Sequence, residues 1–256
     1  MALETPSKIH NLIEEPIQQS LIRMTMPMII GMIMLFTFSL VDTWFISFLG
    51  TESLTAISFT FPVTFTVMSM AIGLGIGASA VVASYLGASE LDKAKESATV
   101  INYISFGMAC MIVLLCWIFM DRIFILMGAS DQLMVPIREY MNIWFPGSVL
   151  IVCIMTGNSI LRAIGDTKTP SILMASAGLI NAVLDPLLIF GLGPFPELGM
   201  QGAAWSTIIA WLIGFCYLIY LLIFRVKMVS KTLPSRSVFI SAGKKMLRIG
   251  VPAAGA

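Results

Sequence analysis

Residues 181–191 read NAVLDPLLIFG, and this stretch places a carboxylate, Asp185, inside a long apolar run. Asn181 lies one helical turn before Asp185, and Pro186 follows it directly. An ionisable side chain within a membrane-spanning helix costs about 2.5 kcal/mol or more on insertion scales, so such residues usually line a substrate or ion pathway. The function of the chain therefore depends on whether Asp185 lies in a membrane, and on which groups surround it.

The composition is typical of a polytopic membrane protein. Of the 256 residues, 58% are hydrophobic and 11% are charged, and the mean hydropathy is +0.94. A soluble globular domain carries about 25% charged residues. We therefore expect an all-α fold surrounded by membrane lipids. The net charge of +1 gives no reason to expect a nucleic-acid partner.

Six apolar runs have the roughly 20 residues that a spanning helix needs. They cover residues 22–48, 54–86, 100–126, 140–164, 172–190 and 200–224. A seventh run starts near Leu247. The expected organisation is a cytoplasmic tail (1–21), a six-helix membrane lobe (22–224), a basic linker or interfacial helix (225–246), and the truncated start of a second repeat (247–256).

The basic residues are distributed unequally between the two sides of the membrane. With the N-terminus in the cytoplasm, 13 of the 15 Lys and Arg residues fall in cytoplasmic segments, and only Arg122 and Arg138 fall outside. Cytoplasmic loops carry an excess of positive charge. We therefore expect a multi-pass protein of the cell inner (plasma) membrane with a cytoplasmic N-terminus.

Two helix starts share a short pattern. Pro27 follows Arg23 by four residues, and Pro252 follows Arg248 at the same spacing. A repeat after six spans is typical of transporters built from two similar halves, although two helix starts can also match by chance. If the repeat is real, the chain is one half of a protein of about 450 residues. Its partner is then a C-terminal six-helix lobe, in the same full-length chain or in a second copy.

Two of the 14 acidic residues, Asp42 and Asp185, fall inside the expected spans. At 1.5 Å per residue, both carboxyl groups lie about 8–10 Å from the outer ends of their helices. Asn181 shares a helix face with Asp185, Thr207 enters from the outside at a similar depth, and Asn158 lies deep in the fourth span. These five residues form a predicted cation site, in which Na⁺ would bind at Asp42, Asn181, Asp185 and Thr207. Asn158 and Thr207 can instead be structural, because such side chains often bond neighbouring helices.

Two prolines lie in the helices of this predicted site. Pro186 directly follows Asp185, and Pro27 lies in the helix of Asp42. Proline removes a backbone hydrogen bond and clashes with the preceding turn, so both helices should bend or break there and act as hinges.

Two other interpretations of these motifs are less consistent with the residues. Paired intramembrane aspartates also occur in proteases, as one acid and one base. That class uses Tyr-Asp and G-x-G-D motifs, whereas Asp42 follows Val41 and Asp185 follows Leu184 here, so we expect no enzyme. The glycines of GLGIGASA (73–80) lie in an apolar span without a preceding strand, which favours close helix packing over a nucleotide loop.

Five stretches resemble the multidrug and toxic compound extrusion (MATE) family of secondary transporters. They are VDTWFISFLG (41–50), IGLGIGASAVVASYLG (72–87), LRAIGDTKTP (161–170), NAVLDPLLIFG (181–191) and GMQGAAWSTIIA (199–210). The third and fourth are the most specific. The resemblance covers the N-terminal lobe only, and Asp185 is similar to the aspartate of the prokaryotic branch around DNA-damage-inducible protein F.

The resemblance implies two six-helix lobes around a central cavity. It implies multidrug efflux of small organic cations or other drugs, often bulky, by antiport with H⁺ or Na⁺ and without a further cofactor. Carried over by position, the family's cation site falls on Asp42, Asn181, Asp185 and Thr207, with Asn158 close by. The alternatives are a lipid-linked sugar flippase of the same superfamily, which tends to carry basic residues in its cavity, and a lobe fragment that does not transport.

Overall fold

The computed structural model describes residues 17–230 and 236–255. All regular structure in these two segments is helical, as the composition predicts. The helices are α2 (Ile17–Ser47), α3 (Thr51–Gly87), α4 (Leu91–Ile118), α5 (Met120–Leu126), α6 (Asp131–Ala163), α7 (Lys168–Ile189), α8 (Met200–Tyr220), the π-helical turn η1 (Leu221–Arg225) and α9 (Arg236–Ala254).

Six helices of the described segments are long and apolar enough to cross a membrane, which confirms the expected number of spans. They are α2 from Met24 onward, α3, α4, α6, α7 and α8 with η1. The third and fourth spans differ most from expectation. The third ends at Ile118 and is followed by the short α5, and the fourth begins at Asp131 instead of near residue 140. The apolar run marks only the part of a helix that lies within the membrane, and α6 extends before it through the polar turn around Arg138.

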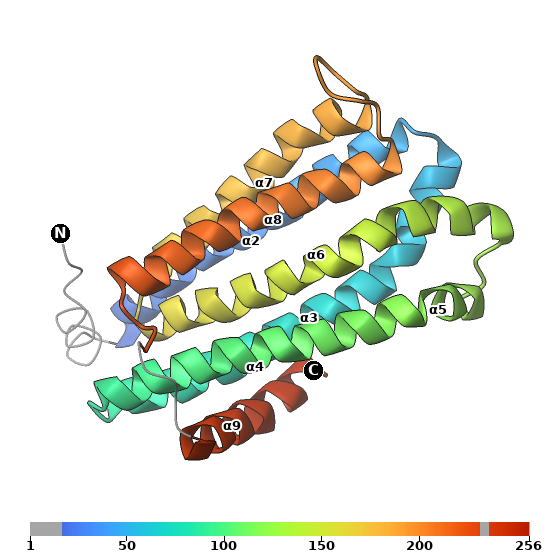
Figure 1. The fold of residues 1–256 in the computed structure, drawn as a ribbon. Coiled ribbons are helices and arrows are strands. Elements are labelled where there is room, and N and C mark those ends of the chain that lie inside the picture. Colours follow the sequence, from blue (N-terminus) through green and yellow to red (C-terminus); the bar gives the residue numbers. More distant parts are fainter. Residues whose placement is uncertain (1–16, 231–235, 256) are drawn as a thin grey trace.

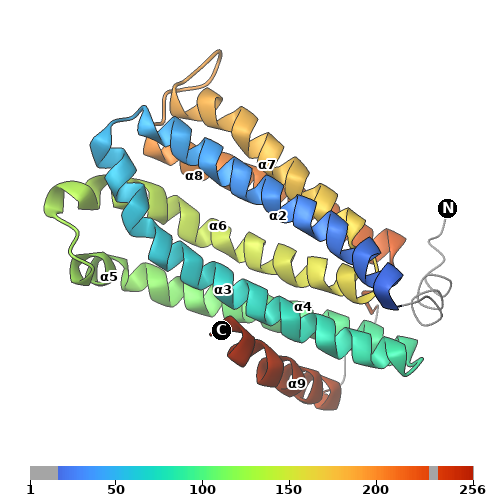
Figure 2. The same ribbon diagram turned by 180° about the vertical axis from the view of Figure 1, so that it is seen from behind.

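The helices form a bundle with α6 at its centre. In Figure 1, α7 and α8 lie on one side of α6, and α3 and α4 lie on the other; Figure 2 shows α2 beside α7. The contacts agree, because α6 packs against α3, α4 and α8, whereas α2 packs mainly against α7. α6 is the most buried of the six spans and α2 is the least buried.

α9 is one continuous helix that packs along α3 and α4 at the edge of the bundle (Figure 1). Its backbone approaches α3 closely, since a Cβ atom on Gly73 would lie 2.5 Å from the carbonyl oxygen of Gly250. Ser69 Oγ donates to Ala254 O at 2.6 Å, and Lys245 Nζ lies 3.1 Å from Tyr85 Oη. The expected boundary between linker and second repeat, at 246/247, falls inside this helix.

The close packing predicted for the GLGIGASA stretch is present on two faces of α3. Gly73 and Gly77 meet α9, whereas a Cβ atom on Gly75 would lie 2.5 Å from Ser159 Oγ of α6. Absence of a side chain at these positions lets three helix backbones approach one another, which larger residues would prevent.

The two predicted hinge prolines lie inside continuous helices. α2 runs through Pro27, and α7 runs through Pro186 and ends at Ile189. Pro186 therefore does not break the fifth span beside Asp185. It lies so near the end of α7 that the helix stops within one further turn. The hinge function of both prolines stays a prediction.

Candidate functional site

Asp185 lies near the C-terminal end of α7 and is completely buried. Its Oδ1 atom accepts hydrogen bonds from Asn181 Nδ2 at 3.2 Å and from Ser206 Oγ of α8. Asn181 Nδ2 also lies 3.1 Å from Ser206 Oγ and 3.2 Å from Thr207 Oγ1. A polar network therefore joins α7 to α8 inside an otherwise apolar bundle.

The register between α7 and α8 is fixed by the turn that connects them and by Gly202. The amides of Leu198 and Gly199 donate to the carbonyls of Leu188 and Ile189 at 3.0 and 3.1 Å, which folds the loop back onto the end of α7. A Cβ atom on Gly202 would lie 2.5 Å from Leu188 O, so the two helices touch through backbone at this point. Ser206, one turn further along α8, consequently reaches Asp185.

Asp42 is brought to Asp185 by the packing of α2 on α7. A Cβ atom on Gly178 would lie 2.6 Å from Phe38 Cγ, and one on Gly31 would lie 3.2 Å from Ser171 Cβ. These two close contacts bring α2 and α7 together along their length. The carboxyl groups of Asp42 and Asp185 lie within hydrogen-bonding reach of each other.

One oxygen of each carboxyl group has no protein partner. Within residues 17–230 and 236–255, Asp42 Oδ1 and Asp185 Oδ2 are buried atoms without a hydrogen bond. None of the ion pairs found in that part of the chain involves either aspartate. A buried polar atom left unpaired costs about 1–3 kcal/mol. A cation between the two free oxygens would remove this cost.

The donor set fits a small monovalent cation. The described residues contain no group of three or more His, Cys, Asp or Glu side chains that could hold a metal ion. Two carboxylates with the hydroxyl oxygens of Ser206 and Thr207 beside them are hard ligands of the kind that alkali and alkaline-earth cations prefer, whereas Asn181 turns its Nδ2 donor toward this network. The same carboxyl pair can hold a shared proton instead.

The predicted residues are brought together with one exception. Asp42, Asn181, Asp185 and Thr207 are joined by direct contacts. Asn158 is completely buried in α6, and neither its Nδ2 nor its Oδ1 atom has a hydrogen-bond partner among the described residues. No hydrogen bond links Asn158 to the other four, so its part in the site stays a prediction.

Sequence reasoning missed two residues near the site. Ser206 is completely buried and contacts Asp185 directly. Tyr140 of α6 is buried within electrostatic range of Asp42 and Asp185. The sequence shows that Ser206 is a polar neighbour of Thr207, but it does not show that Ser206 faces α7. Tyr140 gave no signal, because it lies at the predicted start of its span, where a tyrosine is ordinary.

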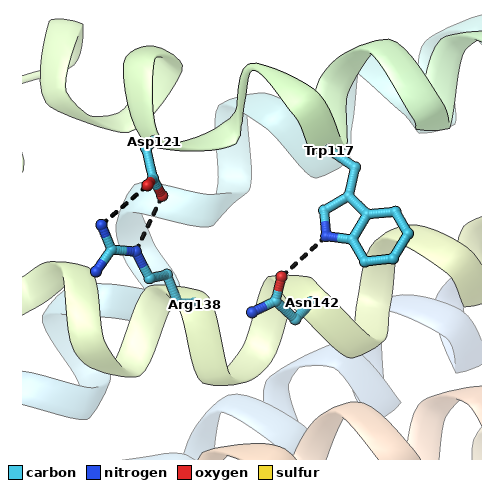
Figure 3. Close-up of polar contacts among 4 residues, drawn as sticks. All are labelled: Trp117, Asp121, Arg138 and Asn142. Carbon is cyan, nitrogen blue, oxygen red and sulfur yellow. Dashed lines mark hydrogen bonds and ion pairs between the residues drawn. The ribbon is translucent and has the colours of Figure 1, made fainter.

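A second set of polar contacts joins the end of α4 and α5 to α6, as shown in Figure 3. Arg138 of α6 donates to both carboxylate oxygens of Asp121 in α5, at 3.0 and 2.9 Å, and Trp117 Nε1 donates to Asn142 Oδ1 at 2.9 Å. A cavity of about 360 Å³ lies beside them and is lined by Val135, Arg138, Glu139, Asn142, Ile143 and Gln201. Neither Asp42 nor Asp185 lines this cavity. The contacts of Arg138 and Asn142 therefore hold α4 and α5 against α6 at a place apart from the aspartate pair.

Comparison with known proteins gives concordant results. The MatE family model matches residues 27–187. The chain is 40% identical over 245 residues to a protein of Shewanella oneidensis named FAD transporter, covering 96% of this chain and 54% of that protein. It is 28% identical over 199 residues to the multidrug export protein MepA of Staphylococcus aureus, covering 77% of this chain and 43% of that protein.

Solved structures share the fold. A MOP superfamily transporter from Pyrococcus furiosus superimposes with a TM-score of 0.85 at 31% identity, covering 95% of this chain and 53% of that one. The bent form of the Vibrio cholerae MATE transporter VcmN gives a TM-score of 0.84 at 28% identity, with coverage of 98% and 54%. The chain thus spans about half the length of the relatives it matches. Those relatives are transporters and not enzymes.

Proposed function

The chain belongs to the MatE family, and we propose that it forms the cation-coupling lobe of a secondary exporter. In this proposal the complete transporter moves organic compounds out of the cell in exchange for H⁺ or Na⁺. The observation that carries it is the pair of carboxyl groups, Asp42 on α2 and Asp185 on α7, that meet inside the membrane bundle. Neither forms an ion pair with a basic side chain in the described part of the chain.

The geometry supports coupling between cation binding and helix contact. Two carboxylates that meet at low dielectric repel each other, and a cation or proton between them removes the repulsion. Asp42 belongs to the least buried helix, α2, whereas Asp185 is held by Asn181 and Ser206 at the α7–α8 contact. α2 is therefore the element free to respond, and Pro27 is where we expect it to bend.

The proposed ligands for Na⁺ are the free oxygens of Asp42 and Asp185, with Thr207 and Asn181 beside them. A bound Na⁺ or H⁺ would supply only positive charge. Thr207 offers a hydroxyl oxygen that already accepts a hydrogen bond from Asn181. Asn158 would join only if a water or a shift of α6 connected its unpaired amide to the site.

Two cargo classes are candidates. The Staphylococcus aureus relative is named a multidrug export protein, which favours bulky organic cations and other drugs. The Shewanella oneidensis relative is named an FAD transporter and is 40% identical to this chain over 96% of its length. The higher identity to this relative supports FAD, an anionic dinucleotide, as the other candidate cargo. Neither of these two relatives is named a flippase, so the lipid-linked sugar alternative has no support from them.

Calorimetric titration of the purified chain with Na⁺, at several pH values, tests the coupling site. We expect saturable binding that disappears in Asp42→Asn and in Asp185→Asn. Asp121→Asn is the matched control, because Asp121 is an acidic residue at the outer surface, paired with Arg138. If no Na⁺ binds, a proton site predicts proton uptake that the same two variants lose. Binding or uptake that survives both substitutions would refute the proposal.

A further inference from the structure

Ser206 differs from most hydroxyl residues in the membrane helices. Hydroxyls such as those of Thr156 and Ser148 bond only to a carbonyl three or four residues earlier in their own helix. Ser206 Oγ has that carbonyl as well, with Ala203 O at 2.9 Å. It also contacts Asp185 Oδ1 and Asn181 Nδ2 on the neighbouring helix.

The Ser206 hydroxyl has one proton and two acceptors within reach. A hydroxyl donates one hydrogen bond and accepts up to two. Hydrogen bonds to an ionised carboxylate are about twice as strong as those to a neutral acceptor, so the proton is directed to Asp185 rather than to Ala203 O. Asn181 Nδ2 fills the acceptor side at 3.1 Å, which orients the hydroxyl further.

This arrangement makes the two oxygens of Asp185 different. Oδ1 receives both Asn181 and Ser206, whereas Oδ2 is buried without a partner in the described part of the chain. The torsion that turns a carboxylate about its Cβ–Cγ bond has a broad energy well. Two donors on one oxygen therefore decide which oxygen is left for a cation and where it lies.

We propose that Ser206 is a positioning residue of the coupling site, whose hydroxyl holds Asp185 Oδ1 so that Oδ2 is presented toward Asp42. The expected effect on cation affinity rests on the proposed function. The contact itself is independent of that function. A hydroxyl that merely fills space between α7 and α8 would leave the carboxylate of Asp185 unaffected when it is removed.

Infrared spectroscopy of the purified chain tests the contact without any bound cation. The stretching band of Asp185 is identified as the band that Asp185→Asn removes. We expect Ser206→Ala to shift this band, because Oδ1 loses one donor, and Ser206→Thr to restore it. Ser148→Ala is the matched control, since Ser148 is also completely buried and bonds to Phe145 O at 2.7 Å but touches no carboxylate.

A Na⁺ titration of the same variants tests the consequence. We expect Ser206→Ala to bind Na⁺ about tenfold more weakly than the parent, as for the loss of one hydrogen bond to a charged group. Ser206→Thr and Ser148→Ala should stay within about twofold of the parent. Circular dichroism confirms that each variant is folded.

The outcomes separate the two proposals. An Asp185 band that is unchanged in Ser206→Ala, or that shifts equally in Ser148→Ala, overturns the positioning role whatever the cations do. A shifted band in a chain that binds neither Na⁺ nor H⁺ upholds the Ser206–Asp185 contact and refutes the coupling function. A shifted band with unchanged Na⁺ affinity limits Ser206 to structure and overturns the inference as stated.

Discussion

Among the uncharged residues of the site, Asn181 contacts the largest number of other site residues. Its Nδ2 group lies within 3.2 Å of Asp185, Ser206 and Thr207, and so links two helices. Asn181→Ala should lower the free energy of unfolding by about 1–3 kcal/mol, because buried acceptors lose their donor. It should also weaken Na⁺ binding about tenfold or more. Chemical denaturation and calorimetry measure the two effects.

The control for this prediction is Asn102→Ala. The amide of Asn102 donates only to Ala98 O of its own helix, at 3.0 Å. We expect it to change stability by less than about 1 kcal/mol and to leave Na⁺ affinity unchanged. Equal loss of affinity in both variants would show that helix disturbance, and not the Asn181 network, sets cation binding.

At the residue scale, depth and polarity selected Asp42, Asn181, Asp185 and Thr207, which the fold brings together; their role as a cation site stays a prediction. A carboxylate in an apolar run is rare enough to be found without a structure. Ser206 was missed because the neighbour of Thr207 that faces α7 depends on the rotation of α8 about its axis. That rotation is set by the backbone contact at Gly202, which no local pattern encodes.

At the scale of helices, the α3–α9 contact depends on glycine. Gly73→Ala would place a Cβ atom 2.6 Å from that of Ala254, so α9 would have to move away. We expect faster hydrogen exchange at the α9 amides. The free energy of unfolding should fall by about 1–3 kcal/mol, as at other overpacked sites. The glycine stretch predicted close packing, but it could not name α9 as the partner, because the two segments are far apart in the sequence.

Gly107→Ala is the matched control for the glycine substitution. Gly107 lies within α4, and a Cβ atom there would meet nothing within 4 Å. Alanine at an open helix position stabilises by about 0.5–1 kcal/mol. Slower exchange or unchanged protection of α9 in Gly73→Ala would contradict the close approach of α3 and α9.

The Asp121–Arg138 pair gives α5 a pH-dependent attachment to α6. The two hydrogen bonds from Arg138 lower the pKa of Asp121 below its ordinary value of 3.8. A carboxyl group whose pKa is lower in the folded state stabilises the fold above its ordinary pKa. That contribution is lost as the pH falls through the lowered value. Both side chains are about half exposed, so the contribution is small and is screened by salt.

We therefore expect Asp121→Asn to lower Tm slightly at neutral pH. The difference from the parent should shrink as the pH falls below 3.8. Thermal unfolding across this range measures it. In an Arg138→Gln background, Asp121→Asn should have no further effect at any pH. A Tm difference that is constant with pH, or that grows on acidification, would show that the pair is not responsible.

For the whole molecule, hydropathy correctly located six spans but not their arrangement. α6 is the most buried span and also the least apolar, with a hydropathy of 1.6 against 2.4 for the span Met200–Arg225. Lipid-facing helices have to be apolar, whereas a central helix can carry polar residues. This difference was available in the sequence, and it would have placed α6 at the centre.

The predicted orientation of the lobe rests on its basic residues. The sequence pattern assigns 13 of the 15 to the cytoplasmic side, so the loop before Lys168 should lie in the cytoplasm and the loop around Pro194 outside. In a chain without its native cysteines, Pro194→Cys should react with a membrane-impermeant maleimide in intact cells. Lys168→Cys should react only after lysis. The reverse pattern would invert the topology.

In the proposed function this lobe binds the cation, whereas movement of the cargo needs a second lobe as well. The site residues Asp42, Asn181, Asp185, Ser206 and Thr207 all lie in α2, α7 and α8, so every proposed ligand of the cation belongs to this chain. Alternating access requires two repeats that move around a central site, and the chain spans about half of its matched relatives. α2 is the least buried span and exposes apolar side chains, and we expect a second lobe to pack against them.

We therefore expect proteoliposomes that contain only this chain to bind radioactive Na⁺ without moving an organic cation or FAD across the membrane. The Shewanella oneidensis relative, reconstituted in the same way, is the control for cargo movement. Cargo movement by the chain alone, abolished by Asp185→Asn, would show that two copies of this lobe can act as a transporter. Absence of both Na⁺ binding and proton uptake in the isolated chain would instead indicate that α2 needs a second lobe to hold Asp42 beside Asp185.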